Sequence, residues 1–230
     1  MRNRVKARAT FACALAIVLG GSRLLHADGE ASTPRASADR ALWVGARAGV
    51  FVPYGGLYAE RNLVTRSFRD VAAGGPSIEI DVGARLTRRW VGFGFAQYAM
   101  LGSGMPSALI FSHGAQTGVT TQATGVAVRW ISDPDGWGPV VELGLGYRWL
   151  SASWQDGTVL RLGGFGDAHL GVGGNLRLGR QVELSPMLTF SAGSFRNRSL
   201  ANEPVGPLSS SYTAIGLDLG GHFDLFGASQ

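Results

Sequence analysis

Strict alternation of apolar residues with polar or small ones recurs along this sequence and constrains its fold more than any other feature. In the stretch VELGLGYRWL, which begins at Val141, every second residue up to Tyr147 is apolar and the residues between them are Glu or Gly. Successive side chains of a β-strand point to opposite faces, so this period indicates a strand with two unlike faces. Eight such runs follow residue 41: 42–52, 77–86, 90–101, 119–131, 140–150, 159–178, 182–192 and 212–226.

The connections between these runs alternate in length. They are short after the second, fourth and sixth runs (TRR, SDPDGWG and GRQ) and longer after the others, at 53–76, 102–118, 151–158 and 193–211. Tight turns at one end and long loops at the other are typical of β-barrels in the bacterial outer membrane. The pattern predicts an all-β fold, an eight-stranded antiparallel up-and-down transmembrane β-barrel over residues 41–226, with both chain ends on the periplasmic side and a short tail over 227–230.

The N-terminal segment has the order of a secretory signal peptide. Four basic residues within the first eight precede an apolar run over 11–19, and small residues follow. This order predicts a cleaved signal peptide over 1–27, with Ala27 or Ser22 at the cleavage position. The alternative is a membrane anchor, but nine apolar residues fall short of the ~20 that a spanning helix needs. Residues 28–40 are polar and are predicted to form a flexible periplasmic linker.

Removal of this segment changes the charge of the chain. The whole sequence has 21 basic and 16 acidic residues, and five basic but no acidic residues lie within 1–27, so the remainder carries 16 of each. The basic isoelectric point therefore comes from the signal peptide, and the mature composition gives no support for nucleic-acid binding. The single cysteine, Cys13, also lies in the signal peptide, and a chain without thiols suits an oxidising periplasm.

The non-apolar face of the runs combines balanced charges with many glycines. A solvated face would need no glycine, whereas small residues and paired charges suit a narrow interior, so this face is predicted to line the barrel lumen. A soluble, lipocalin-like barrel is the alternative, but it would need a polar exterior that these faces do not supply. The predicted lumen charge network consists of Arg47, Glu79, Asp81, Arg85, Arg129, Glu142, Arg148, Arg161, Asp167, His169, Arg177, Glu183, Asp218 and His222, with Asp224 on the same face.

Turn positions also predict partners within this network. A turn fixes which residues of its two strands lie opposite one another, and opposite charges on one face stabilise a strand pair. Chance juxtaposition in a glycine-rich sheet is the alternative. The pairs predicted in this way are Arg129 with Glu142 and Arg177 with Glu183; Arg148, about six residues further toward the outside, is expected to meet a different carboxylate, with Asp167 as the candidate.

The apolar face is predicted to contact lipid, and Phe93 and Phe95 are assigned to it. Tryptophans near the run ends predict two interfacial girdles. Alternation alone would place Trp43 and Trp90 on the inner face, where they could instead plug the barrel mouth. The girdle candidates are Trp43, Trp90, Trp130, Trp137 and Phe226 on the short-turn side, and Trp149 and Trp154 on the other.

The opening segment GARAGVFVPYG and the closing segment GLDLGGHFDLF, together with the strand pattern, resemble a known group. Over residues 41–226 the chain is similar to the small eight-stranded outer-membrane proteins, which include the OmpA transmembrane domain, OmpX and the OmpW family. The resemblance implies an outer-membrane location. It also implies that the barrel-assembly machinery reads Phe223 and Phe226 as an assembly signal, although GASQ follows Phe226 here.

An eight-stranded barrel encloses an interior just wide enough for side chains, so a general porin is not expected. We expect a structural or surface-interaction protein, monomeric, with no cofactor or metal and no enzymatic activity. A narrow channel for small solutes, suggested by the OmpW resemblance, is one alternative. A lipid A-modifying enzyme is another, with His113 beside Ser112 and His169 beside Asp167 as candidates, but no motif joins a nucleophile, a base and an orienting group.

The long loops carry arginines, whose planar guanidinium groups bind phosphate well. Outer-membrane lipid and lipopolysaccharide are therefore the expected partners, besides the assembly machinery. The alternative is that these loop charges are merely solvated. The candidate lipopolysaccharide contacts are Arg61, Arg66, Arg69, Arg196 and Arg198.

Overall fold

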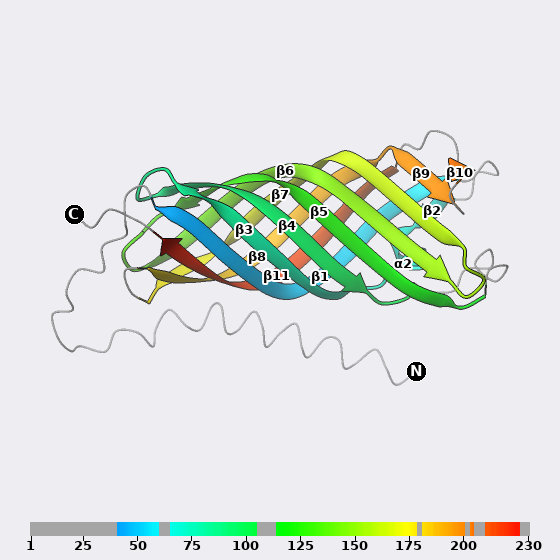
Figure 1. Cartoon of the computed structure of the whole chain (residues 1–230), viewed down its shortest axis with the longest axis horizontal. Coiled ribbons are helices and arrows are strands. Elements are labelled where there is room, and N and C mark those ends of the chain that lie inside the picture. Colours follow the sequence, from blue (N-terminus) through cyan, green and yellow to red (C-terminus); the bar gives the residue numbers. More distant parts are fainter. Residues whose placement is uncertain are drawn as a thin grey trace. The chain divides into compact units, whose positions relative to one another are not determined.

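The computed structural model of the protein describes residues 41–59, 65–104, 114–178, 181–200, 203–204 and 210–225. The predicted signal peptide, linker and tail lie outside these residues. Eight long antiparallel strands pair in chain order, and the last pairs with the first, so the barrel is closed (Figure 1). This confirms the predicted eight-stranded up-and-down barrel. The strands are β1 (Leu42–Ala59), β3 (Gly75–Arg85), β4 (Trp90–Leu101), β5 (Gln116–Ile131), β6 (Trp137–Trp154), β7 (Val159–Arg177), β8 (Val182–Phe195) and β11 (Ser210–Leu225).

Four short elements lie together at one end of the barrel. They are β2 (Thr65–Ser67), α2 (Phe68–Val71), β9 (Asn197–Leu200) and β10 (Glu203–Pro204), and Figure 1 shows them opposite the short turns. The short turns join β3 to β4, β5 to β6 and β7 to β8 with four or five residues each. Short turns mark the periplasmic end of such barrels, so the short elements lie at the extracellular end. Among the residues that the structure describes, no helix is long and apolar enough to cross a membrane.

The two faces of the wall differ in the way that the alternation predicts for a membrane barrel. The outward face is apolar around most of the circumference. Among the arginines and carboxylates of the eight long strands, all but Arg161 point inward, and most of them are buried. Water could not solvate such an exterior, whereas lipid can. Strongly exposed aliphatic side chains on this face include Val50, Ile78, Ile80, Val82, Val126, Leu143, Leu145 and Leu219.

Aromatic side chains delimit the apolar band along β6. Trp137 and Trp149 both point outward and are 54% and 41% exposed. Twelve residues separate them, which corresponds to about 30 Å along the barrel axis at a rise of ~3.3 Å per residue and a strand tilt of ~40°. This is close to the thickness of a bilayer core, so the two residues mark its two interfaces.

The barrel continues past the outer interface. Strand β6 runs on to Trp154 and β7 begins at Val159, and in this extension the outward residues of β6 are Ser151 and Ser153. The inward residues there are apolar and form a core of their own. The barrel therefore has a charged interior within the membrane and an apolar interior above it.

Strand β4 faces the opposite way from the prediction. Phe93 and Phe95 were assigned to the lipid face but are only 5% and 6% exposed, and they point into the barrel. Neither face of β4 carries an ionised residue that could mark the lumen side. Inside the barrel Phe93 lies 4.8 Å from the Trp43 ring, centroid to centroid, and Phe95 lies 5.0 Å from the His169 ring.

Arg161 is not a member of the lumen network, contrary to the prediction. It is exposed on the outward face of β7, whereas Asp167, an even number of residues later, is buried inside. The cause is a β-bulge at Gly166, which has a φ of +87° and is skipped in the pairing with β6. One extra residue in a strand reverses the facing of everything beyond it.

Two tryptophans differ from the girdle prediction, and a third, Trp90, agrees with it but differs from the inner-face alternative. Trp43 is fully buried inside the barrel and Trp154 is 7% exposed within the extension, so neither contacts lipid. Trp90 points outward and is 45% exposed, not inward as alternation suggests, because the facing of the whole β4 strand is reversed. Trp90 therefore joins Trp137 at the periplasmic interface.

Candidate functional site

The lumen network is centred on Glu142 of β6. One carboxylate oxygen accepts hydrogen bonds from two nitrogens of Arg47, both at 3.1 Å, and lies 2.8 Å from Nε2 of His169. The other oxygen accepts from Nε and Nη2 of Arg129, at 3.0 and 2.8 Å. Arg129 and Glu142 lie opposite one another in the ladder, as the position of the turn predicts. All three partners of Glu142 are buried, so the carboxylate neutralises charge that water does not reach.

Arg47 extends this cluster across the lumen to β3. Its Nε donates to Asp81 at 3.1 Å, and it also forms an ion pair with Glu79. His222 of β11 lies 3.3 Å from the same Asp81 carboxylate. Cations and carboxylates therefore alternate across the middle of the barrel, which is the arrangement that makes a buried charge tolerable.

A second cluster fills the periplasmic end. Arg85 donates to Asp224 and to Glu183, both at 3.0 Å, and Arg177 donates to Asp224 at 2.6 Å. Arg177 is also the ladder partner of Glu183, with 3.6 Å between their charged atoms. Arg129 lies 3.7 Å from Glu183 and so joins this cluster to the one around Glu142.

A third cluster lies toward the outside. Arg148 donates to Asp167 at 3.2 and 2.9 Å and to the Gln97 side-chain oxygen at 3.1 Å. Gln97 in turn donates to Glu79 at 3.2 Å, which connects this cluster to Arg47. The Tyr212 hydroxyl donates to Asp167 on the side of the apolar core. The interior thus holds one continuous polar chain from the periplasmic end to the extension.

Aromatic rings fill the space between these charges. His222 stacks on Trp43 with 4.3 Å between ring centroids, and the Arg129 guanidinium lies 4.8 Å from the centre of the Trp43 ring. The guanidinium groups of Arg47 and Arg129 lie 5.8 and 5.5 Å from the Phe93 ring. Such contacts favour a cation that has left water. Alternation places Trp43 on the inner face, but it could not place Phe93 there, because Phe93 lies on a strand without a charge marker.

Above the third cluster, the helix α2 closes the lumen. Phe68 and Val71 of α2 are 1% and 2% exposed, and the Phe68 ring lies 6.1 Å from the rings of both Phe195 and Tyr212. Gln116 of β5 donates from its amide to the Val71 carbonyl at 2.8 Å and fixes the end of the helix. We call the set of Phe51, Phe68, Val71, Leu150, Leu160, Leu162, Phe195 and Tyr212 the apolar plug.

The remaining predicted site residues have different surroundings. Asp218 lies in the lumen and accepts from Thr189 at 3.2 Å and Ser77 at 3.4 Å. Among the candidate lipopolysaccharide contacts, Arg69 lies over the Tyr54 ring at 5.6 Å, and Arg196 is exposed. Arg198 is half-buried, and Phe223 is 49% exposed on the outward face. Arg61, the side chain of Arg66, His113, Ser112 and Phe226 lie outside what the structure describes.

The described histidines contact charge, not nucleophiles. His169 contacts Glu142, and His222 lies between Asp81 and Arg129. Among the described residues, no hydrogen bond joins either ring to a hydroxyl, and no group of three metal-ligating side chains is close enough to hold a metal. The arrangement is that of a charge-neutralising network.

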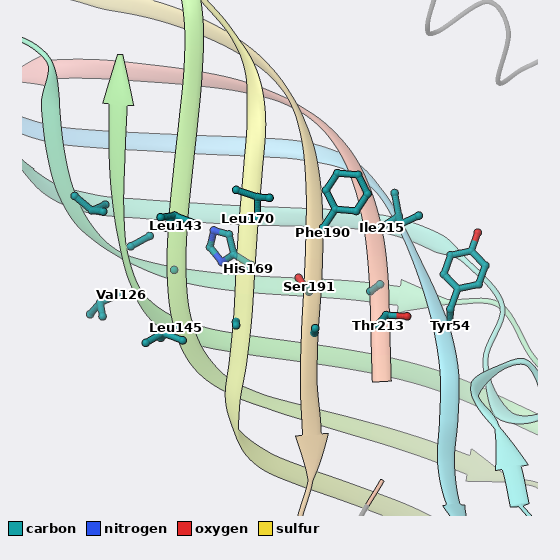
Figure 2. Close-up of a pocket in the computed structure, with 16 residues that line it drawn as sticks. Tyr54, Val126, Leu143, Leu145, His169, Leu170, Phe190, Ser191, Thr213 and Ile215 are labelled. Carbon is teal, nitrogen blue, oxygen red and sulfur yellow. The ribbon is translucent and has the colours of Figure 1, made fainter. Parts of the chain in front are cut away.

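A groove of about 1040 Å³ runs along the wall formed by β5, β6, β7, β8, β11 and β1 (Figure 2). Its most exposed lining residues, Val126, Leu143, Leu145, Leu170 and Phe190, belong to the outward face. Small side chains such as Ala168 and Ala192 leave the space between them. The groove therefore belongs to the lipid-facing surface, where acyl chains fill such hollows.

Comparison with known proteins gives matches at the level of the fold. No protein-family model and no curated protein matches the chain. The solved structure of the outer membrane protein OprG from Pseudomonas aeruginosa aligns with a TM-score of 0.55 and 8% identity, covering 85% of this chain and all of OprG. The outer membrane protein AlkL, solved in lipid bilayers, aligns with a TM-score of 0.53 and 14% identity over 90% of this chain and all of AlkL. Neisserial surface protein A aligns with a TM-score of 0.49 and 13% identity, over 80% of this chain and 97% of its own.

Sequence identities this low show a shared fold but not a shared function. The features that decide the environment are in the chain itself: a closed wall, an apolar exterior bounded by aromatic residues, and an interior in which the charges pair with one another. The chain is thus a small, eight-stranded integral barrel of the bacterial outer membrane.

Proposed function

We propose that the protein is a closed barrel that conducts no solutes and that acts through its extracellular surface, in a structural or surface-interaction role. The observation that supports this most strongly is that two different fillings follow one another along the lumen. A solute would have to break the ion pairs around Glu142 and then displace the apolar plug.

Displacing either the ion pairs or the apolar plug from the lumen costs free energy. Separating a buried ion pair leaves charge without a partner, which costs about 3–5 kcal/mol. The plug offers no polar path around Phe68, because that side chain packs against the rings of Phe195 and Tyr212. The extension, by contrast, carries polar side chains on its outward face and lies above the apolar band, where a partner could reach it.

The experiment is single-channel recording in planar bilayers with purified, refolded protein. Insertion is checked on gels, where a folded barrel migrates differently before and after boiling. We expect no conductance steps from the native chain. A variant with both fillings reduced, Arg129→Ala and Glu142→Ala combined with Phe68→Ala, is the positive control and is expected to conduct.

Regular conductance steps from the native chain would overturn the proposal and favour a narrow channel for small solutes. A lipid A-modifying activity is the other alternative, and incubation of the folded protein with lipid A tests it. We expect no change in the acyl chains, because neither described histidine contacts a hydroxyl nucleophile.

A further inference from the structure

The outward face of the barrel at the extracellular ends of β6 and β7 carries an exposed cluster that the closed interior does not use. Arg161 of β7 points away from the barrel because of the bulge at Gly166, and it lies opposite Ser151 in the ladder with β6. On its other side it lies opposite Ser199 of β9. A buried role for Arg161 is thus ruled out, and its surroundings are hydroxyl groups.

The backbone of Arg196 is hydrogen-bonded to β7 two residues from Arg161. Its backbone N–H donates to the Gly163 carbonyl at 2.9 Å, and Gly163 is two residues from Arg161 on the same strand, about 7 Å along it. Both arginine side chains are exposed. Within the part of the chain that the structure describes, neither guanidinium has a hydrogen bond or an ion pair with a carboxylate.

An aromatic shelf lies directly below these arginines, on the membrane side. The Tyr147 ring lies 4.7 Å from Trp149 and 4.9 Å from Phe165, between ring centroids. Phe165 is 73% exposed. Tyr147 can lie across β7 because Gly163 has no side chain: a Cβ there would overlap the tyrosine hydroxyl. The Asn197 amide, 3.5 Å from that hydroxyl, borders the shelf from β9.

The cluster sits at the height of lipid headgroups. Along β6 the outward residues change from Leu143 and Leu145 to Tyr147 and Trp149, and then to Ser151. Aromatic rings mark the membrane interface. Ser151 and its partner Arg161 lie two residues above Trp149, about 7 Å further along the strand. This is where the phosphates of outer-leaflet lipid lie.

We propose that Arg161 and Arg196 bind a phosphate group of lipopolysaccharide, while Tyr147, Trp149 and Phe165 contact the lipid below it. The guanidinium fork fits two phosphate oxygens, and no described carboxylate pairs with it. The serines and Asn197 supply further hydrogen bonds. This patch, and not the earlier set of loop arginines as a whole, is the phosphate site, and it does not depend on whether the lumen conducts.

The test measures binding of diphosphoryl lipid A to the folded protein in zwitterionic micelles, by native mass spectrometry. We expect Arg161→Gln combined with Arg196→Gln to weaken binding at least about tenfold, because charge-assisted bonds to phosphate are lost. Lipid A with both phosphates removed should bind the native protein and the double variant equally weakly.

The matched control is Arg89→Gln, an exposed arginine in the periplasmic turn between β3 and β4, which should bind as the native chain does. Gel mobility before and after boiling shows that each variant is folded. Unchanged affinity in the double variant, or equal binding of lipid A with and without phosphate, would overturn the proposal. Both results are independent of bilayer conductance.

Discussion

Glu142 is the residue on which most of the buried charge depends. It contacts three cationic or protonatable side chains, Arg47, Arg129 and His169, and all of them are buried. Asp167 has a smaller role, with Arg148 and Tyr212 as its partners. Since removal of one partner leaves the others uncompensated, the cost of losing a carboxylate should follow the number of cations that it serves.

Replacing Glu142 with Gln is therefore expected to lower the free energy of unfolding by about 3–5 kcal/mol, because two arginines lose their neutralising charge. Asp167→Asn should cost less, since one arginine is affected. Urea unfolding of the barrel in lipid vesicles measures both. The exposed Arg89→Gln should stay within about 0.5 kcal/mol of the native chain. Equal stabilities of Glu142→Gln and this control would contradict the network's role.

At the scale of elements, α2 is the part whose structure depends most on its surroundings. A helix of four residues, Phe68–Val71, has no stability of its own in water. It is fixed by the burial of Phe68 and Val71 in the apolar plug and by the hydrogen bond from Gln116. The strands around it are held by continuous ladders, so the helix can be lost while the barrel stays.

Phe68→Ala is therefore expected to release α2 without unfolding the barrel. Loss of a buried phenylalanine costs about 3–5 kcal/mol, more than so short a helix can offset. Hydrogen exchange of the amides of residues 67–72 should become faster, while those of β6 stay protected and the gel shift on boiling is kept. Arg69→Ala, on the exposed side of the same helix, should change little. Unaltered exchange in Phe68→Ala would show that the helix is held in another way.

Element order and the strand ends at the short turns could be predicted from the sequence, because alternation and turn length follow directly from how a strand faces two environments. The extracellular ends could not, since β1 runs to Ala59 and β6 to Trp154, beyond the predicted limits of 52 and 150. Facing was predicted correctly where a charge marked the inner side, as on β6. It failed on β4, which has no ionised residue, so that Phe93 and Phe95 were placed outside. It also failed for Arg161, because a bulge at a glycine is invisible in the period of the sequence.

The charge network and the apolar plug also differed in how far the sequence could predict them. The pairs of Arg129 with Glu142 and Arg177 with Glu183 follow from strand register, which a turn fixes locally. The apolar plug unites residues from strands and loops that are far apart in the sequence, such as Phe68 and Phe195. No local pattern contains that contact, so three-dimensional structure was needed to find it.

At the scale of the whole molecule, one barrel is adapted to two surroundings along its length. Within the membrane, the outside is apolar and the inside charged; above Trp149 the outward residues become polar and the inside apolar. The tryptophans differ accordingly in their surroundings, since those at the interfaces face lipid and those in the lumen or the extension do not. Quenching of their fluorescence by lipid can therefore map the change.

The last prediction uses chains that retain a single tryptophan, with the other five replaced by Phe, in vesicles of brominated lipid. Trp137 and Trp149 should be strongly quenched, because both are exposed on the outward face at the interfaces. Trp43 should not be quenched, because it lies inside against His222 and Arg129, and neither should Trp154, which packs in the interior of the extension. Retention of the gel shift on boiling shows that each variant is folded. Strong quenching of Trp43 would mean that the faces of β1 are reversed, whereas quenching of Trp154 would place the extension inside the membrane.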